Sequence, residues 1–307
     1  MMIRWRKPAI WLLVIAVVAF FPLLVKYEYI TSLLITLFIY ISIAESWNLL
    51  GGYTGQISLG HSAFFGLGAL GARLLWVANV PIVAAVILGG VSSALLAAVV
   101  GVPCLRMRSA YFPIGTLALS MIALLTVANL FPIPGALPKN FLDAYDIFSR
   151  YYLGMAVALL TMLIVYWIVN SRTGLAVVAI RDNEQAAMAM GVRTLRYKVL
   201  SVVLSSFLAG LGGGVYAYQH VSYYYDTPFD LIWSFTPTLT TFIGGLGTIL
   251  GPVLGSVCFL LLSELFAVTL GEVHVLIFGL SFILIVLFLP GGLMSIKDML
   301  LYRSNGR

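Results

Sequence analysis

The chain has 307 residues, of which 62% are hydrophobic and only 9% are charged, with a net charge of +6. This composition lies outside the range of soluble proteins and indicates an integral membrane protein. It excludes a disordered tail, a disulfide-stapled secreted domain and a large nucleic-acid-binding module, which need polar or cysteine-rich sequence. The two cysteines, Cys104 and Cys258, are isolated in apolar runs, and we assign them no function.

Apolar stretches bounded by charge, proline or glycine predict an all-α bundle of about ten transmembrane helices, because about 20 apolar residues cross a bilayer. Ten crossings use about 200 residues, so we expect one transmembrane domain over 1–307 and no sizeable soluble part. Basic residues precede the first stretch, but no small-residue cleavage site follows it, which favours a retained helix over a signal peptide. The predicted crossings are 8–25, 29–50, 61–79, 80–102, 111–131, 151–170, 199–219, 231–250, 252–270 and 275–290.

The distribution of basic residues predicts the orientation of these crossings. With a cytoplasmic N-terminus, ten crossings place the C-terminus in the cytoplasm too, with thirteen Lys and Arg residues in inside segments and three outside. This bias obeys the positive-inside rule, and it explains the net charge better than nucleic-acid binding does. The inside set is Arg4, Arg6, Lys7, Arg106, Arg108, Arg172, Arg181, Arg193, Arg196, Lys198, Lys297, Arg303 and Arg307, against Lys26, Lys139 and Arg150 outside.

Two glycine-rich regions, 51–71 and 244–252, are not typical of plain helices. Paired Gly/Pro interruptions in the two halves of a chain indicate a transporter's central pathway, so we predict broken segments there. The alternative, favoured for any single glycine, is that small residues let helices pack closely. We predict that polar side chains around the two breaks line a translocation path, namely Gln56, Ser58, His61, Thr236, Thr238, Thr240 and Thr241.

His61 opens the predicted third crossing beside the first break. A hydrogen bond from its ring to a freed backbone carbonyl is favoured over metal binding, because no second His or Cys stands near it in sequence. Ionisable residues at membrane depth are few: Glu45, Arg73 and Glu264. Such residues are functional candidates, and we expect Glu45 or Glu264 to pair with Arg73, with a direct ligand role as the alternative.

The longest predicted inside segment, 171–198, contains a short helix with both ends marked. Asp182 is predicted to cap its N-terminus with Gln185 as a box partner, and Gly191 to end it in a left-handed turn. An apolar stripe of Ala186, Ala187 and Met190 must pack on another surface, because eight residues of helix are marginal alone. The alternative is a helix resting on lipid headgroups, but the stripe lacks the bulky side chains typical of that arrangement.

Four motifs together resemble the LivM-type permeases of branched-chain amino acid importers. They are residues 47–66 (WNLLGGYTGQISLGHSAFFG), 106–112 (RMRSAYF), 181–191 (RDNEQAAMAMG) and 244–255 (GGLGTILGPVLG). The third resembles the E-A-A-x-x-x-G loop of ABC importer permeases, a short helix that docks into a groove of the ATP-hydrolysing subunit. The chain departs from the family pattern at 289–293 (LPGGL). The resemblance implies that the residues for ATPase coupling are Arg181, Asp182, Glu184, Ala187 and Gly191.

This resemblance implies a permease subunit that moves branched-chain or other small hydrophobic amino acids across the bacterial inner membrane. It also implies two ATP-binding subunits, a second homologous permease and an extracytoplasmic substrate-binding protein as partners. The chain itself lacks the phosphate-binding pattern G-x-x-x-x-G-K-[ST], so we expect no ATP, other cofactor or enzymatic activity on it. The alternatives are a urea or short-chain amide importer, an ion-coupled secondary transporter or channel, a membrane-embedded enzyme and a structural scaffold.

Overall fold

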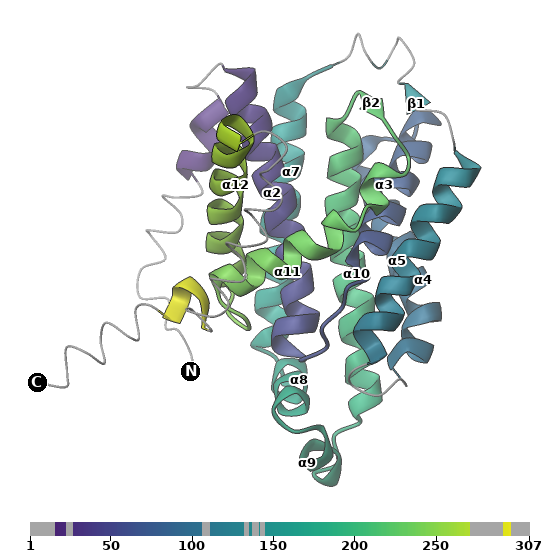
Figure 1. Ribbon diagram of the computed structural model, residues 1–307, viewed down its shortest axis with the longest axis vertical. Coiled ribbons are helices and arrows are strands. Elements are labelled where there is room, and N and C mark those ends of the chain that lie inside the picture. The colour runs from purple at the N-terminus through teal and green to yellow at the C-terminus, as the bar shows by residue number, and fades with distance from the viewer. Residues whose placement is uncertain are drawn as a thin grey trace, which may run out of the picture.

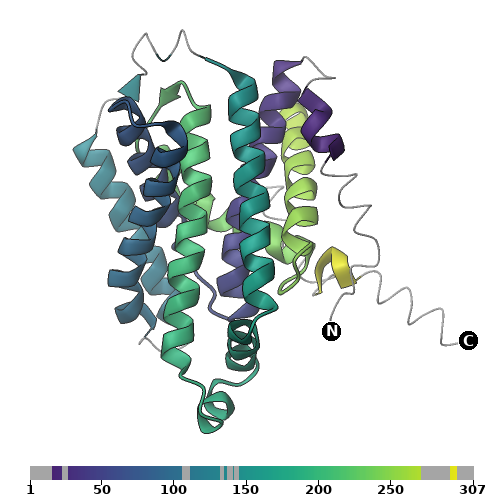
Figure 2. The same ribbon diagram turned by 180° about the vertical axis from the view of Figure 1, so that it is seen from behind.

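The computed structural model describes residues 16–22, 27–105, 111–131, 135–136, 141, 145–270 and 291–295. Long helices run side by side in one bundle, and α9 lies beyond one end of it (Figures 1 and 2). The helices are α2 Glu28–Asn48, α3 His61–Val77, α4 Ile82–Leu105, α5 Tyr111–Leu130, α7 Ile147–Val169, α8 Arg172–Asp182, α9 Glu184–Ala189, α10 Thr194–Gln219, α11 Ile232–Gly244 and α12 Gly251–Leu270.

Three kinds of short element connect these helices. A π-helix, η1 Leu49–Tyr53, continues α2, and a 3₁₀ turn, η2 Thr227–Phe229, precedes α11. Strand β1 Gly135–Ala136 pairs antiparallel with β2 Ser222–Tyr223, with Gly135 opposite Tyr223. This pair joins the α5–α7 and α10–α11 connections at the end of the bundle opposite α9 (Figure 1).

Five described helical stretches are long and apolar enough to cross a membrane. They are Glu28–Tyr53, Ile82–Gly101, Tyr111–Leu130, Ile147–Val169 and Thr194–Gln219. These stretches confirm the predicted all-α membrane fold. Of the predicted crossing 8–25 the structure describes 16–22, which are helical, and 275–290 lies outside the described residues.

The predicted crossing 61–79 corresponds to α3, which ends two residues earlier, whereas the prediction of a full-length helix over 231–250 is wrong. Helix α3 has 17 residues and α11 has 13, about 26 and 20 Å at 1.5 Å per residue, whereas the hydrocarbon core is about 30 Å thick. Non-helical residues 54–60 precede α3, and a stretch holding β2 and η2 precedes α11. Figure 1 shows α11 running obliquely across the bundle rather than along it. Both segments are therefore discontinuous, as the glycine-rich patterns predict.

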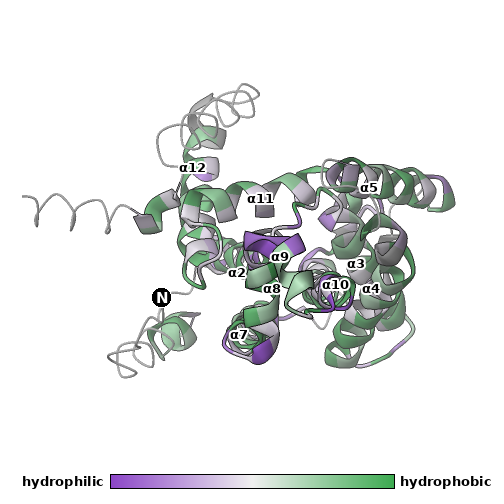
Figure 3. Cartoon of the chain, turned by 90° about the horizontal axis from the view of Figure 1, so that it is seen from below, coloured by the Kyte–Doolittle hydropathy of each residue, from purple (hydrophilic) through white to green (hydrophobic). Residues whose placement is uncertain are grey.

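Helix α10 is the central packing element, and its glycines allow close contact with α3. A Cβ atom at Gly213 would collide with the backbone carbonyl of Phe65, and one at Gly68 would collide with the backbone of Gly210. Small residues thus let the two backbones approach, as in other membrane helix pairs. For these glycines the packing interpretation is confirmed. Seen from the α9 end, α4 and α5 are mostly hydrophobic whereas the start of α9 is hydrophilic (Figure 3).

Candidate translocation and coupling site

The first break begins where α2 widens into the π-helix η1. The ring of Trp47 lies so close to Gly51 that a Cβ there would be 2.5 Å from ring atom Cη2. The Thr54 hydroxyl donates to the Leu49 carbonyl at 2.9 Å, and Trp47 Nε1 donates to the Ser58 carbonyl at 2.8 Å. Side chains therefore bond the backbone groups that the helix leaves free at this turn.

The second break follows from Pro237 and the glycines after α11. Proline interrupts helical hydrogen bonding, and its own carbonyl accepts from the hydroxyls of Thr240 at 3.1 Å and Thr241 at 2.6 Å. Gly245 and Gly247 have φ angles of +131° and +68°, a backbone region that glycine adopts without strain. Helix α11 accordingly ends after 13 residues and turns into α12.

Asn48 joins the two breaks. Its Nδ2 donates to the Thr248 carbonyl at 2.9 Å, and its Oδ1 accepts from the Gly247 backbone N–H, also at 2.9 Å. Arg181, at the end of α8, extends into the same place and donates from Nη1 to the Gly52 carbonyl at 3.0 Å. A Cβ at Gly247 would lie 2.8 Å from that same nitrogen. The 171–198 segment therefore contacts both breaks directly.

The N-terminal ends of the two short helices α3 and α11 meet inside the bundle. The Ser62 backbone N–H donates to the Ser234 Oγ at 2.9 Å. The meeting point lies near the middle of α10. His61 is the first residue of α3, and its Nε2 lies 2.9 Å from the hydroxyl of Ser205, which is the twelfth of the 26 residues of α10. No acidic residue occupies the first turn of α3. The partial positive charge of this helix end is thus placed deep in the bundle.

The predicted hydrogen bond from the His61 ring to a freed backbone carbonyl is not observed. Ser205 donates its only hydroxyl proton to the Ser46 carbonyl at 2.6 Å, so the ring nitrogen Nε2 is the donor to Ser205. The imidazole is fully buried. The histidine therefore bonds to a carbonyl of α2 only through a serine hydroxyl from α10.

The other predicted path residues lie inside the chain in this conformation. Ser58 and the four threonines are buried, and only Gln56 is half-buried. The hydroxyls of Thr238, Thr240 and Thr241 donate to backbone carbonyls, Thr241 also to Ala44 of α2. The exposed face of α11 is instead apolar, with Ile232 and Phe235. The structure thus gathers the predicted polar residues between α2, α3, α10 and α11, but it does not open a path along them.

The predicted ion pair of Arg73 with Glu45 or Glu264 is wrong. Arg73 lies at the C-terminal end of α10, where it donates to the carbonyls of Ala217, His220 and Val221 at 3.0 to 3.3 Å. Carbonyls at a helix C-terminus attract cations, which accounts for this placement. Glu264 accepts instead from the Tyr29 hydroxyl at 2.7 Å. Glu45 is fully buried, and neither carboxylate oxygen has a hydrogen-bond partner in the described part of the chain.

Helix α9 begins one residue later than predicted. Asn183, and not Asp182, is its cap: the Asn183 Oδ1 accepts from the Ala186 N–H at 3.0 Å, whereas Asp182 is the last residue of α8. The predicted box with Gln185 is therefore wrong, and the helix has six residues rather than eight. The predicted turn at Gly191 is confirmed, since its φ is +87°.

Only one residue of the predicted apolar stripe packs inward. Ala187 is fully buried, whereas Ala186 and Met190 are exposed, as is Met188. The helix is held to the bundle by Glu184, whose carboxylate lies 2.6 Å from Nζ of the buried Lys198 on α10. Helix α9 thus presents two methionines to its surroundings while one alanine and one ion pair anchor it.

Several of these partners were missed from the sequence. Asn48, Ser205 and Ser234 are polar residues within apolar helices, and that is the signal that could have singled them out. Lys198 was assigned only to the inside charge set, although it pairs with the coupling candidate Glu184 of α9. These contacts join residues 14 to 200 positions apart.

Taken together, the bundle with its two discontinuous helices defines a multi-pass membrane permease. Residues 29–288 match the family model described as the branched-chain amino acid transport system / permease component, and the chain belongs to this family. The match confirms the predicted resemblance to LivM-type permeases.

Curated relatives have the same description. A probable branched-chain amino acid transport permease protein LivM of Methanocaldococcus jannaschii is 24% identical, over 71% of this chain and 70% of the relative. The high-affinity branched-chain amino acid transport system permease protein LivM of Salmonella typhimurium is 24% identical, over 88% and 71%. Its Escherichia coli counterpart is 23% identical, over 87% and 70%. No solved structure matches the chain.

Proposed function

We propose that this permease is a subunit of an ATP-driven importer of branched-chain or other small hydrophobic amino acids. Two ATP-binding subunits, a second homologous permease and an extracytoplasmic binding protein complete the assembly in the bacterial inner membrane. The α9 end faces the cytoplasm, together with both termini. The printed names of the relatives support the substrate class and the transport system. ATP binds to the partner chains, not to this one.

The observation that carries the coupling proposal is the contact of Arg181 with the first break. Helix α9 docks on an ATP-binding subunit through the exposed Met188 and the residue that follows the helix, Met190. Only Asn183 separates α9 from the end of α8. Movement of α9 reaches η1 through the hydrogen bond from Arg181 to Gly52. It reaches the second break through Asn48, which bonds to the 247–248 backbone. Closure of the ATP-binding subunits thereby shifts both breaks together and alternates access.

The path forms between α3 and α11 when the breaks shift. In that state the buried hydroxyls, Gln56 and His61 line the opening, and they bind a polar solute weakly enough to release it. The N-terminal end of α3, deep in the bundle and without an acidic residue in its first turn, suits the carboxylate of an amino acid. Urea and simple amides lack such a negative group, so this helix end favours the amino-acid substrate.

Reconstitution tests the proposed function. The complete assembly in proteoliposomes, supplied with its binding protein, is expected to accumulate leucine, isoleucine or valine only when ATP is present on the α9 side. Uptake of urea or acetamide in place of amino acids would identify the substrate as an amide. Uptake that follows an ion gradient and ignores ATP would instead identify a secondary transporter.

A further inference from the structure

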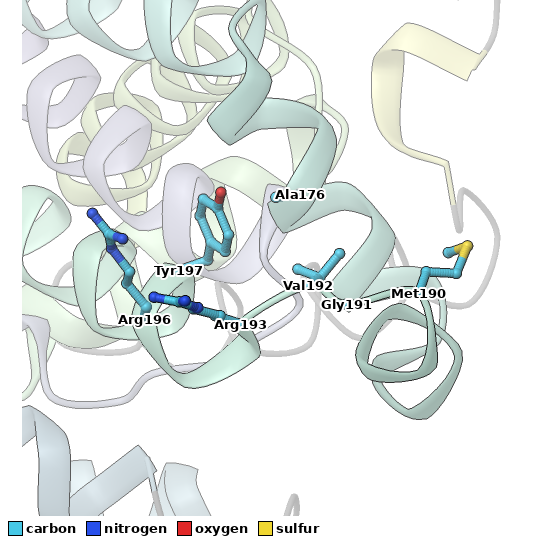
Figure 4. Close-up of a pocket in the computed structure, with 7 residues that line it drawn as sticks. All are labelled: Ala176, Met190, Gly191, Val192, Arg193, Arg196 and Tyr197. Atoms are coloured by element: carbon cyan, nitrogen blue, oxygen red, sulfur yellow. The ribbon is translucent and has the colours of Figure 1, made fainter.

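A pocket of about 330 Å³ lies beside α9, between α8 and the first turn of α10. Ala176 contributes the α8 wall, and Met190 and Gly191 contribute the end of α9. Figure 4 shows Arg193, Arg196 and Tyr197 on one side of this pocket and Met190 on the other. The pocket is therefore both basic and continuous with the surface of α9.

The two arginines have no acidic partner in the described part of the chain. The ion pairs found there are Arg181 with Asp182 and Lys198 with Glu184. Arg193 and Arg196 are exposed. A guanidinium forms strong bidentate contacts with a carboxylate, so this pair is available for an anion.

The position of the arginines on α10 adds to the positive charge. Arg193 is the N-terminal cap residue of this 26-residue helix, its side chain makes no capping hydrogen bond, and no acidic residue occupies the first turn. Acidic residues are favourable at a helix N-terminus and basic residues unfavourable, because the helix dipole is positive there. Arg193 and Arg196 therefore raise a positive potential that an added anion would neutralise.

We propose that this pocket receives an acidic side chain, Asp or Glu, of the ATP-hydrolysing partner subunit. The proposal rests on the proposed function, in which that subunit covers α9. Met190 belongs both to the exposed surface of α9 and to the pocket wall. A protein that covers the methionine therefore lies at the pocket mouth, where the charge is complementary to a carboxylate. The ATP-hydrolysing subunit thus contacts the chain twice, through the exposed surface of α9 and through a carboxylate in the basic pocket beside it.

The test is a binding measurement on the full-length chain in phosphatidylcholine nanodiscs, with the ATP-hydrolysing subunit that co-purifies with it. Charge reversal by Arg193→Glu and Arg196→Glu together is expected to weaken that affinity about 100-fold, or about tenfold per arginine, and to reduce its dependence on salt. Arg172→Glu is the matched control, because Arg172 is exposed on α8 but does not line the pocket. The control is expected to bind like the unchanged chain.

Three outcomes would overturn the proposal. Equal affinity of the double variant and the unchanged chain would show that no carboxylate enters the pocket. A loss of affinity only in nanodiscs containing phosphatidylglycerol would assign the pocket to a lipid phosphate. An equal loss in Arg172→Glu would show a general effect of charge.

A third variant separates this proposal from the proposed function. Gly191→Val places a β-branched residue at a φ of +87° and should distort the end of α9. If this variant loses the partner while the arginine variants keep it, only the pocket proposal fails. If the unchanged chain binds no ATP-hydrolysing subunit at all, the proposed function fails with it.

Discussion

Arg181 bonds the 171–198 segment to the first break in the membrane part of the chain. We predict that Arg181→Ala uncouples transport, because it removes the charged donor to the Gly52 carbonyl. A hydrogen bond to a charged donor contributes about 1.5–3 kcal/mol, less where water screens it, so amino acid uptake per ATP hydrolysed should fall about tenfold. Arg181→Lys retains the charge and should lose less. An unchanged ratio of uptake to hydrolysis in Arg181→Ala would remove this residue from the coupling route.

Arg73 illustrates a charge that stabilises the fold. Its guanidinium lies 5.1 Å from the ring centre of Tyr223 and bonds to backbone carbonyls at the end of α10. We predict that Arg73→Leu lowers the free energy of unfolding by several kcal/mol, because each buried carbonyl left without its donor costs about 1–3 kcal/mol. Thermal unfolding of the detergent-solubilised chain measures this, with Arg73→Lys as the conservative control. Equal melting temperatures for Arg73→Leu and the unchanged chain would contradict the role.

At this scale the sequence identified the residue types but not their partners. Arg73 and His61 stood out as rare polar residues in apolar segments, yet their partners lie 144 or more positions away. Pairing with Glu45 or Glu264 was the simplest expectation for Arg73, whereas its guanidinium bonds to the C-terminal carbonyls of α10 and neither of these carboxylates reaches it. The cap of α9 was shifted by one residue because Asp182 and Asn183 are both good cap residues, and only tertiary packing selects between them.

Among the elements, α9 depends on the turn that ends it. We predict that Gly191→Val impairs coupled transport, because a β-branched residue is strained at a φ of +87°. Gly191→Asn is the matched control, since asparagine tolerates left-handed backbone and should retain most of the activity. Amino acid uptake in proteoliposomes compares the two variants. Equal activity of the valine and asparagine variants would show that the turn is not needed.

The sequence predicts that the chain is interrupted next to α3 and α11, but it does not predict the length of α11. Glycine clusters and Pro237 marked the places where regular helix fails, and those places are observed. Hydropathy extended the second segment to residue 250, because Leu246, Ile249 and Leu250 are also apolar, whereas α11 ends at Gly244. The side chains that replace the missing backbone bonds, such as Trp47 and Thr241, determine where each helix ends.

The opposing N-terminal ends of α3 and α11 suggest a test at the same scale. Ser234→Ala removes the hydroxyl that accepts from the Ser62 N–H and leaves that buried donor unpaired. The loss of a buried partner costs about 1–3 kcal/mol, so the contact between the half-helices should loosen. We predict lower uptake and raised ATP hydrolysis without substrate, with Ser92→Ala on α4 as the control. Unchanged hydrolysis in Ser234→Ala would separate this contact from gating.

For the whole molecule, composition and periodicity were enough to predict an all-α membrane bundle, and the ordered motifs were enough to predict the permease family. The assembly of residues 48, 52, 181 and 247 at one end was not predictable, because it depends on how four distant segments fold together. The motifs nevertheless contain all four positions. The structure brings these four positions from three separate motifs into one contact, in which the 171–198 segment meets the two breaks.

We propose that this permease works with separate ATP-hydrolysing chains. The most direct measurement is purification of the tagged chain from its native membrane in mild detergent, followed by mass spectrometry of the proteins that accompany it. We predict recovery of an ATP-hydrolysing subunit and a second permease, and loss of the former in Gly191→Val. A chain recovered alone, which still moves solute in vesicles without ATP, would contradict the account.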